Sequence, residues 1–437
     1  MTFHFPFRKK KSKENHIYKN LSKNEIKTFT ISAVGGSLEF YDFVVYIYFA
    51  TIMSKLFFQN DSPVAGLILT YSVFACGYLA RVLGGLVFSH FGDKNGRKNS
   101  FSFTVFLMAA PTFIIGILPT YSQIGITASI LLFICRFAQG LAIGGEIPCS
   151  ITFIYEHAQK SHRGLACGIL FCGIIFGIFL GSSAGYLVTK FMSEETIYSW
   201  GWRIPFLVGG ILGLIGVYLR RYLTETPVFR QMKKENIKYP VQLIFKDHKF
   251  SLIQTASAIW VVAVAITLYL LYLPNYFKTY YSYHSEDILK INSIFVLIYA
   301  LFIVIFGYIS DKIGGRKVFN FSCILFIIFS YPIFISFSEN NFTAIYICYS
   351  IVSVASAAAT SSAILLLAES YPAKIRYSGS SLSYNLAFGI FGGFTPLIAT
   401  TLIEHFKSKS APAFYMILVA IIGFILSIIK KNKVHDS

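Results

Sequence analysis

Charged residues are scarce in this sequence, and acidic residues are the scarcest of them. Asp, Glu, Lys and Arg make up 13% of the 437 residues, and 20 residues are acidic. Apolar residues make up 55%, and the mean hydropathy is +0.61. Soluble proteins of this length form a core with fewer apolar residues. The composition therefore excludes an ordinary soluble protein and indicates a membrane protein.

The patterns that mark a reactive or metal-binding centre are also missing. The seven cysteines lie inside apolar runs without metal-ligand spacing, so we expect them to act as small packing side chains. The sequence has no Ser/His/Asp constellation, histidine cluster or phosphate-cradling loop, because its glycine-rich stretches fall inside the apolar runs. We therefore expect that the protein is not an enzyme and that it binds no metal or cofactor.

Long apolar runs are what the sequence has instead. A helix that crosses roughly 30 Å of hydrocarbon needs about 20 apolar residues. Twelve runs meet this requirement, near Thr28–Phe57, Gly66–Phe91, Ser100–Leu118, Gly125–Tyr155, Gly164–Lys190, Ile204–Tyr222, Ser251–Tyr276, Ile288–Ile309, Val318–Phe337, Thr343–Ala368, Tyr377–Ile403 and Ala413–Ile429. A polar segment, Thr224–Lys249, separates the two sets of six.

These runs predict an all-α membrane protein with 12 transmembrane helices in two pseudo-symmetric six-helix bundles. The predicted parts are a basic cytoplasmic tail (1–27), a first bundle (28–222), a cytoplasmic linker (223–250), a second bundle (251–430) and a short cytoplasmic tail (431–437).

A repeated loop supports this division into halves. The basic loop Gly92–Lys98 and its counterpart Ser310–Lys317 each follow an apolar run, half a chain apart. The spacing indicates an internal duplication. A doubled bundle of spanning helices is typical of proteins that move a substance across a bilayer, with the binding site between the halves.

The distribution of basic residues predicts the orientation. Lys and Arg are concentrated in the two tails and in the loops on their side, which places both termini in the cytoplasm. The net charge of +18 therefore reflects topology and does not imply a nucleic-acid partner. The basic run Arg8–Lys11 is instead expected to contact anionic membrane lipid. We expect a multi-pass protein of a bacterial-type cytoplasmic (inner) membrane.

Five ionisable residues fall inside the predicted spans, where an unpaired charge costs several kcal/mol. They are Glu39, Asp42, Arg81, Arg136 and Glu146. Counting about 1.5 Å per residue places Glu39, Arg81 and Arg136 near the middle of the bilayer. We expect the acids and bases to pair in a shared cavity, where Glu39 and Asp42 would carry protons. A static structural ion-pair cluster would have the same composition.

The second half has no comparable charge in its spans and offers neutral polar groups there instead, namely Tyr272, Tyr384 and Asn385. Together with Tyr41 and Arg136 of the first half, they are the candidate ligands for a transported solute. For any single tyrosine, packing is the more common role.

Acidic and basic residues recur in matched positions around the loops on the tail side. The matched residues are Asp93, Arg97, Glu156 and Arg163 in the first half and Asp311, Arg316, Glu369 and Arg376 in the second. Charge clusters of this kind can form in one access state and break in the other, so we predict a gating role. Anchoring by the positive-inside rule would explain the basic residues but not the matched acids.

Several motifs give the chain a family resemblance. The Asp93 and Asp311 loops resemble the signature loop of the major facilitator superfamily. More specific motifs resemble its metabolite:proton symporter family, which includes proline/betaine, α-ketoglutarate and shikimate transporters. These motifs are Glu39–Phe43, Arg136…Gln139-Gly140…Gly144–Glu146, Trp200–Phe206, Glu225-Thr226-Pro227, Tyr272-Leu273-Pro274, Glu369…Arg376–Gly379 and Ser383-Tyr384-Asn385. The chain departs from the loop pattern at Ser89 and Gly315.

The resemblance implies a functional monomer that imports a small organic solute together with protons by alternating access. A zwitterion such as proline or glycine betaine suits a site with charges of both signs. An organic anion such as α-ketoglutarate, which would need arginines without acidic neighbours, is the alternative. A non-transporting membrane sensor on the same fold is a more remote one.

Overall fold

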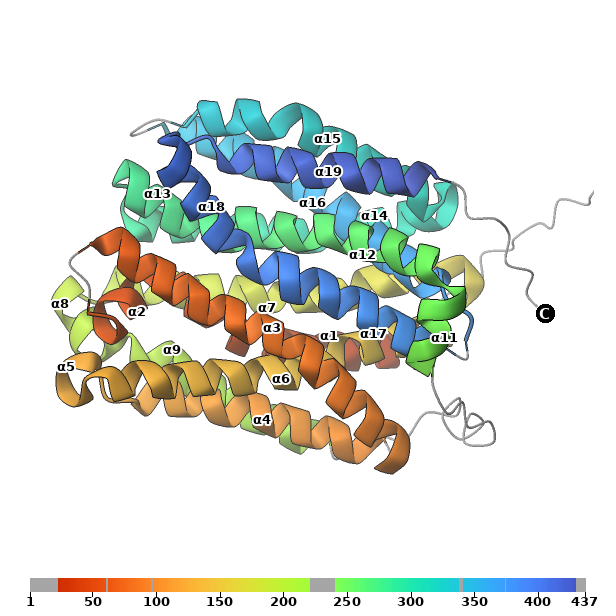
Figure 1. Ribbon diagram of the computed structural model, residues 1–437, viewed down its shortest axis with the longest axis horizontal. Helices are drawn as coiled ribbons and strands as arrows, with labels where there is room; N and C mark the ends of the chain where they lie inside the picture. Colours follow the sequence, from red (N-terminus) through yellow and green to blue (C-terminus); the bar gives the residue numbers. More distant parts are fainter. Residues whose placement is uncertain are drawn as a thin grey trace, which may run out of the picture.

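The computed structural model describes residues 23–59, 62–95, 97–220, 240–337, 341–373 and 375–429. Most of the long helices run along one common direction (Figure 1). The helices of the first half, long and short, are α1 (Lys23–Tyr48), α2 (Ala50–Phe57), α3 (Pro63–Asn95), α4 (Arg97–Ile117), α5 (Tyr121–Ile124), α6 (Ile126–His157), α7 (Arg163–Phe191), α8 (Glu194–Thr196) and α9 (Arg203–Arg220).

In the second half the helices are α11 (Pro240–Asp247), α12 (Lys249–Ala265), α13 (Leu273–Tyr281), α14 (Ser285–Ile313), α15 (Gly315–Ile335), α16 (Phe342–Glu369), α17 (Arg376–Leu386), α18 (Gly393–Phe406) and α19 (Pro412–Ile428). The described ranges also contain short segments that are not α-helical: η1 (Lys160–His162) is a 3₁₀ turn, and η2 (Ile197–Gly201), η3 (Ile266–Tyr272) and η4 (Ala387–Gly392) are π-helical.

The predicted apolar runs coincide with these helices. Eight helices of the described ranges are long and apolar enough to cross a membrane, and a bent helix pair makes a ninth span. Three shorter apolar helices, Phe106–Ile117, Arg203–Ile215 and Pro412–Ile428, occupy the remaining predicted positions. The 12-helix prediction is confirmed, with one correction. The first run is not a single helix, because α1 and α2 meet at an angle of 63° around Phe49.

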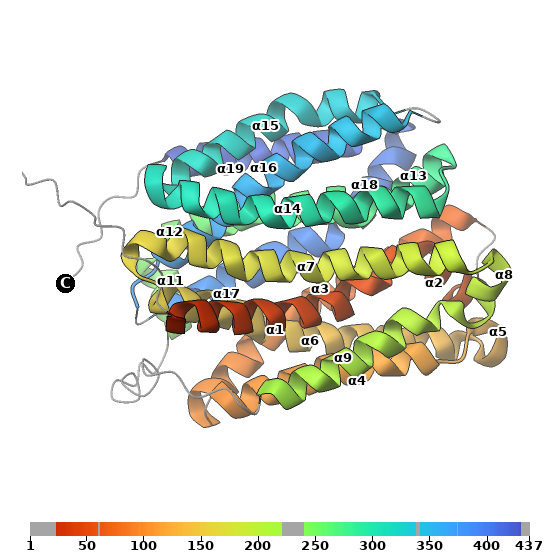
Figure 2. The same ribbon diagram turned by 180° about the vertical axis from the view of Figure 1, so that it is seen from behind.

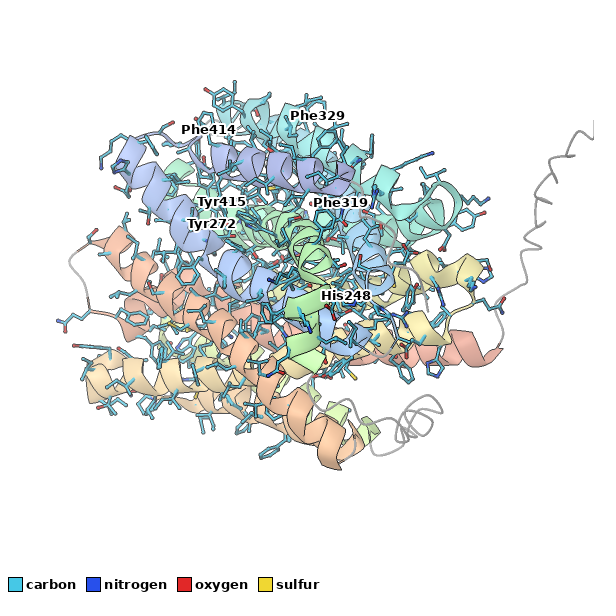
Figure 3. All side chains as sticks on the ribbon, turned by 45° about the vertical axis from the view of Figure 1, so that its right-hand side comes forward. His248, Tyr272, Phe319, Phe329, Phe414 and Tyr415 are labelled. Carbon is cyan, nitrogen blue, oxygen red and sulfur yellow. The ribbon has the colours of Figure 1, made fainter. Side chains whose placement is uncertain are left out.

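Apolar side chains on the outside of the bundle give it a surface suited to lipid. Ile130 and Ile134 of α6 are 51% and 54% exposed, and Phe414 and Leu418 of α19 are 58% and 54% exposed. Each pair is spaced four residues apart and so shares one helix face. Figure 3 places Phe414 at the rim of the molecule, whereas Tyr272 lies between helices.

The two halves meet along α7 and α14, which lie side by side over their length (Figure 2). On its other flank, α7 packs against α1. Glycine makes the close approach to α1 possible, because a Cβ at Gly173 would collide with the Ala33 carbonyl oxygen. Small residues at four-residue spacing commonly bring membrane helices together in this way.

The bundle has two ends, which can be told apart by the helix junctions that lie at each. We call the end where α1 begins and α19 ends the tail end (Figures 1 and 2). The junctions α6–α7, α14–α15 and α16–α17 lie at this end as well. The α1–α2 bend, α8 and α13 lie at the opposite end.

Candidate functional site

Two arginines from neighbouring helices lie at the centre of the protein, and both are fully buried. Arg81 is on α3 and Arg136 is on α6. Glycines bring these helices together, because a Cβ at Gly140 would collide with the Gly77 carbonyl oxygen and one at Gly144 with the Arg81 carbonyl oxygen. The sequence prediction that both arginines are buried in the membrane interior agrees with this placement.

Arg136 is held by polar and aromatic groups. Its NH1 nitrogen donates to the Phe43 carbonyl oxygen at 3.1 Å and to Gln139 Oε1 at 2.8 Å. The guanidinium carbon lies 4.5 Å from the ring centroids of both Phe43 and Tyr46. Nε and NH2 have no hydrogen-bond partner within the described part of the chain. Ring faces stabilise a desolvated cation but leave those two donors unused.

Arg81 lies where the halves meet. Its guanidinium carbon is 5.2 Å from the Tyr78 ring of its own helix and 5.5 and 5.3 Å from the rings of Tyr384 and Phe388 in the second half. None of its three side-chain nitrogens has a hydrogen-bond partner among the described residues, and neither do the hydroxyls of Tyr78 and Tyr384. A buried cation with unused donors around it is electrostatically suited to an anionic group.

Asp42 is not where the predicted ion pair requires it. It is 1% exposed, but no ion pair joins it to Arg136 among the residues that the structure describes. Its carboxylate faces α9 instead, where a Cβ at Gly209 would lie 2.5 Å from Oδ1 and one at Gly213 would lie 3.0 Å from Oδ2. The absence of two side chains on one face of α9 thus makes room for the carboxyl group.

A chain of side chains leads from Arg136 towards this carboxylate. Gln139 accepts from Arg136 and donates through Nε2 to Thr112 Oγ1 at 2.7 Å. The Cβ position of Gly209 lies 3.1 Å from Thr112 Cγ2, so Thr112 and Asp42 border the same point on α9. The Thr112 hydroxyl itself donates to the Met108 carbonyl oxygen at 3.0 Å, so the described hydrogen bonds end beside Asp42 without reaching it.

The two other acids of the predicted spans are Glu146 and Glu39. Glu146 is 4% exposed on α6, next to Gly145, whose carbonyl oxygen accepts from the Tyr377 hydroxyl at 3.2 Å. Glu39 lies on α1, but its side chain is outside the described residues.

The predicted solute ligands divide into two groups. Tyr41 is directed away from the arginines, because its hydroxyl donates to the Pro205 carbonyl oxygen of α9 at 2.9 Å. Tyr384 is central, stacked on Phe388 at 4.5 Å. Asn385 bridges the halves, since its Nδ2 donates to the Gly144 carbonyl oxygen at 2.7 Å while Oδ1 has no partner within the described ranges.

Tyr272 also lies between the halves. Its ring packs edge-on against Tyr71 at 5.8 Å, and its hydroxyl shares a 3.2 Å hydrogen bond with Thr400. Each contact involves a different helix, so Tyr272 connects η3 with α3 and α18.

At the tail end, several predicted gating residues join the halves. Glu156 Oε1 accepts from Arg376 NH1 at 2.7 Å, and both side chains are 14% exposed. Arg163 donates to the Tyr155 hydroxyl at 2.9 Å, and Glu369 lies within electrostatic range of Arg163. The side chains of Asp93 and Arg97 lie outside the described residues.

Asp311 of the second half binds the backbone of a helix in the first half. Its Oδ1 and Oδ2 accept from the backbone N–H groups of Gly164 and Leu165 at 2.7 and 2.8 Å. These groups are at the N-terminus of α7, which favours a negative charge. Arg316 is exposed, and no hydrogen bond or ion pair joins it to Asp311 within the described part of the chain. The gating role of both residues stays a prediction.

The opposite end is also closed. The Tyr48 hydroxyl donates to the Leu270 carbonyl oxygen at 3.0 Å and accepts from Asn292 Nδ2 at 3.1 Å. Asn275 Nδ2 donates to the Ile47 carbonyl oxygen at 2.7 Å. Since polar contacts join the halves at both ends, the arginines lie in an occluded centre.

Sequence reasoning missed several residues of this centre. The missed residues are Tyr78, Thr112, Gln139, Gly209, Gly213 and Phe388. The motif around Arg136 contains Gln139, so its spacing of three residues on one helix was the available signal. No local pattern distinguishes Gly209 from other glycines in apolar helices.

Twelve apolar helices around an occluded, polar centre define a membrane transporter built from two halves. Residues 28–239 match the family model described as sugar (and other) transporter, and residues 255–436 match that of the major facilitator superfamily. The chain is similar to solved structures of a proton:xylose symporter (TM-score 0.72, 20% identity, 92% of this chain and 94% of that one). It is also similar to a partially occluded inward-open form of the xylose transporter from E. coli (TM-score 0.71, 19% identity, 93% and 97%).

Sequence relatives are more similar still. The proline/betaine transporter of Salmonella typhimurium is 33% identical over 420 residues, which is 93% of this chain and 83% of the relative. The glycine betaine/proline/ectoine/pipecolic acid transporter of Dickeya dadantii is 30% identical over 419 residues, with the same coverage of 93% and 83%. The chain belongs to the major facilitator superfamily and, within it, to the metabolite:proton symporter family of the proline/betaine transporters.

Proposed function

We propose that this protein is a proton-coupled symporter that imports a small zwitterion, such as proline or glycine betaine, by alternating access. The observation that carries the proposal is the pair of fully buried arginines with unused donors. A carboxylate that enters the centre would compensate a buried cation, which otherwise costs several kcal/mol. The rings of Tyr78, Tyr384 and Phe388 would position that carboxylate between the halves.

The relatives support the choice of a zwitterion, since their names include proline, betaine and ectoine. The arginines themselves also favour a second candidate, an organic anion such as α-ketoglutarate. Neither Arg81 nor Arg136 forms an ion pair with an acid among the described residues, so two cations are free to bind two carboxylates.

Asp42 is the proposed proton carrier, together with Glu39 as the alternative on the same helix. A charged carboxylate in the cradle of Gly209 and Gly213 has no cationic partner among the described residues, and protonation removes that cost. Arg136 is joined through Gln139 to Thr112, which lies beside Asp42, so the charge of Asp42 would act on Arg136 through space, which is how one centre could couple two ligands.

The remaining parts of the proposal concern topology. The tail end faces the cytoplasm, because the basic residues concentrate there. The protein acts as a monomer in a bacterial-type inner membrane, where Arg8–Lys11 contacts anionic lipid.

Uptake into proteoliposomes tests the function. The purified protein, under an imposed pH gradient, should accumulate labelled proline or glycine betaine, and a protonophore should abolish the accumulation. Accumulation of α-ketoglutarate but not of either zwitterion would establish the alternative, and accumulation of none would contradict both.

Two variants test the coupling. Asp42→Asn should lose accumulation driven by the pH gradient while retaining exchange of labelled for unlabelled solute. Glu39→Gln tests the alternative carrier on the same helix and should keep the accumulation if Asp42 carries the proton. If both variants still concentrate solute, the acids of α1 are structural and the proton path lies elsewhere, with Glu146 as the next candidate.

A further inference from the structure

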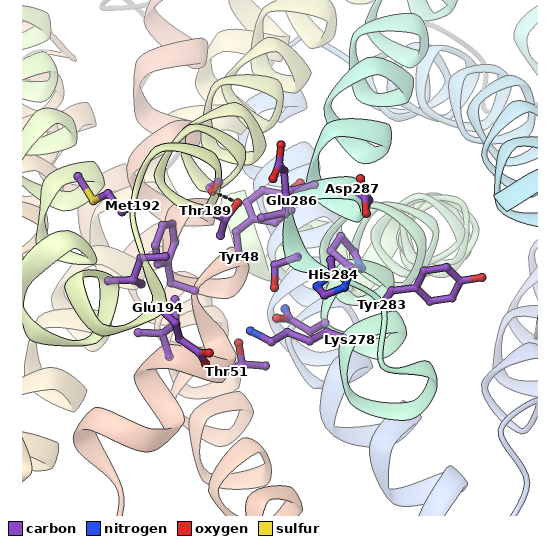
Figure 4. A pocket seen from close by; sticks show the side chains of 18 of the residues that line it. Tyr48, Thr51, Thr189, Met192, Glu194, Lys278, Tyr283, His284, Glu286 and Asp287 are labelled. Atoms are coloured by element: carbon purple, nitrogen blue, oxygen red, sulfur yellow. Dashed lines mark hydrogen bonds between the residues drawn. The ribbon is translucent and has the colours of Figure 1, made fainter. Parts of the chain in front are cut away.

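A cavity of about 450 Å³ lies between the two halves, at the end of the bundle opposite the tail end. We call this cavity the entry pocket. Its walls come from the α1–α2 bend and the region from α7 to η2 in the first half, and from α13 and the start of α14 in the second (Figure 4). Its volume falls within the range of roughly 300–1,000 Å³ typical of small-molecule sites. The arginine centre shares no residue with it.

Charges of both signs line the pocket: the second half contributes Lys278, Glu286 and Asp287, and the first half contributes Glu194. Lys278 of α13 and Glu194 of α8 point towards the same space in Figure 4. No ion pair within 4 Å joins them, and Lys278 has no hydrogen bond among the described residues. Glu286 and His284 line the pocket as well. An ammonium group and a carboxylate that face one space without touching leave room for a ligand with the opposite arrangement of charges.

The floor of the entry pocket is the closure between the halves. Tyr48 and Asn275 both line the pocket, and both form the hydrogen bonds that join α1 to η3 and α13. A solute in the pocket would therefore be separated from the centre by the contacts that must break for it to enter.

We propose that the entry pocket is a second binding site for small zwitterions, in which Lys278 binds the carboxylate and Glu194 the cationic group. The site rests on the proposed function, since it would hold the solute next to the closure before the solute reaches Arg81. The neutral pocket residues Thr51 and Asn275 supply further hydrogen-bonding groups at its walls.

The test is a count of bound solute. Labelled proline and glycine betaine serve as probes in equilibrium binding to the full chain in detergent, up to about 10 mM, which corresponds to the weak end of specific affinity. The wild-type protein should bind two molecules per chain. Lys278→Gln and Glu194→Gln should each bind one, Lys278→Arg should bind two, and Arg81→Gln should retain only the pocket molecule.

Lys290→Gln is the matched control, because Lys290 is exposed on α14 and does not line the pocket. It should bind two molecules, and gel filtration should show the same monodisperse peak for every variant. Two molecules bound by Lys278→Gln would overturn the pocket site, as would a single wild-type molecule that only Arg81→Gln removes. In both cases uptake by the wild-type protein would leave the proposed function intact. Absence of both uptake and binding of these probes would overturn the function and the pocket together.

Discussion

Replacement of Asp311 by Asn is expected to open the tail end of the bundle. The Asp311 carboxylate accepts two backbone N–H groups at the N-terminus of α7, from Gly164 at 2.7 Å and Leu165 at 2.8 Å. An Asn side chain has one carbonyl oxygen and no charge, so one hydrogen bond is lost and the other is weakened. The positive end of the α7 dipole also loses its counter-charge.

The size of the effect follows from these contacts. A hydrogen bond to a charged group contributes about 1.5–3 kcal/mol net. Because Asp311 is partly exposed, solvent screens its charge and the lower part of that range applies. A loss of about 2 kcal/mol would increase the population open at the tail end about 30-fold, since about 1.4 kcal/mol corresponds to a factor of ten.

A native cysteine provides the assay. Cys167 of α7 is fully buried, close to Gly164 and Leu165, so its alkylation requires the tail end to open. With the other six cysteines replaced by Ala or Ser, a maleimide should react about 30-fold faster with Asp311→Asn than with the parent, because the rate follows the open population.

The control for this assay is Arg316→Gln. Arg316 lies in the same loop but is exposed and without a contact among the described side chains, so its replacement should leave the rate unchanged. Equal alkylation rates for Asp311→Asn and its parent would refute the reasoning. An equal acceleration in both variants would show that any change in this loop, and not the loss of the bonds to α7, opens the tail end.

Three further predictions follow from the same contacts. Arg81→Gln should raise the half-saturation concentration for solute uptake at least about tenfold, and Arg81→Lys should have an intermediate effect, because lysine keeps the charge but loses the planar fork. Gly209→Ala would place a methyl group 2.5 Å from Asp42 Oδ1 and should impair proton-driven accumulation while sparing solute exchange. Glu156→Arg should speed alkylation at the tail end by breaking its 2.7 Å pair with Arg376. The charge-swapped double variant with Arg376→Glu should restore part of the closure.

Matched measurements can contradict each of these. Gly315→Ala adds the same methyl group where the nearest atom, in the Leu365 side chain, is 3.3 Å away, and it should leave accumulation intact. An equal loss of accumulation in Gly209→Ala and Gly315→Ala would rule out a specific role of the space that Gly209 and Gly213 leave for Asp42. Unchanged half-saturation in Arg81→Gln would place the solute elsewhere. A double swap no better than Glu156→Arg alone would show that the ion pair does not hold the halves together.

The sequence predicts the helices well because apolar length is a local property. A run such as Gly164–Lys190 must cross the hydrocarbon, and α7 spans Arg163–Phe191. The burial of the arginines is predictable for a related reason, since a charged residue within a membrane-spanning helix faces the interior of the bundle and not the lipid. The bend at Phe49 is not predictable from length, because the run continues through it.

Partners in space are harder to predict than positions in sequence. The acceptor role of Asp311 involves backbone N–H groups of a helix in the other half, which leave no side-chain signature. The placement of Asp42 depends on the rotation of α9 that turns Gly209 and Gly213 towards α1. Glu156 and Arg376 were both identified as gating residues, but their pairing across the halves required the structure. Their gating role stays a prediction.

Two membrane helices contain π-helical segments, η3 before α13 and η4 before α18. In these helices the number of residues decides which way the side chains after the segment point. A π turn contains more residues than an α turn, so side chains beyond it are rotated relative to a continuous α-helix, in which one residue corresponds to about 100°. η3 ends directly before α13, and Asn275 of α13 reaches the Ile47 carbonyl oxygen across the halves. Deletion of one residue from η3 would leave a helix still long enough to span the bilayer but would turn Asn275 away from α1. A one-residue deletion in η3 would therefore rotate the side chains of α13 relative to those of α12, in addition to shortening the helix.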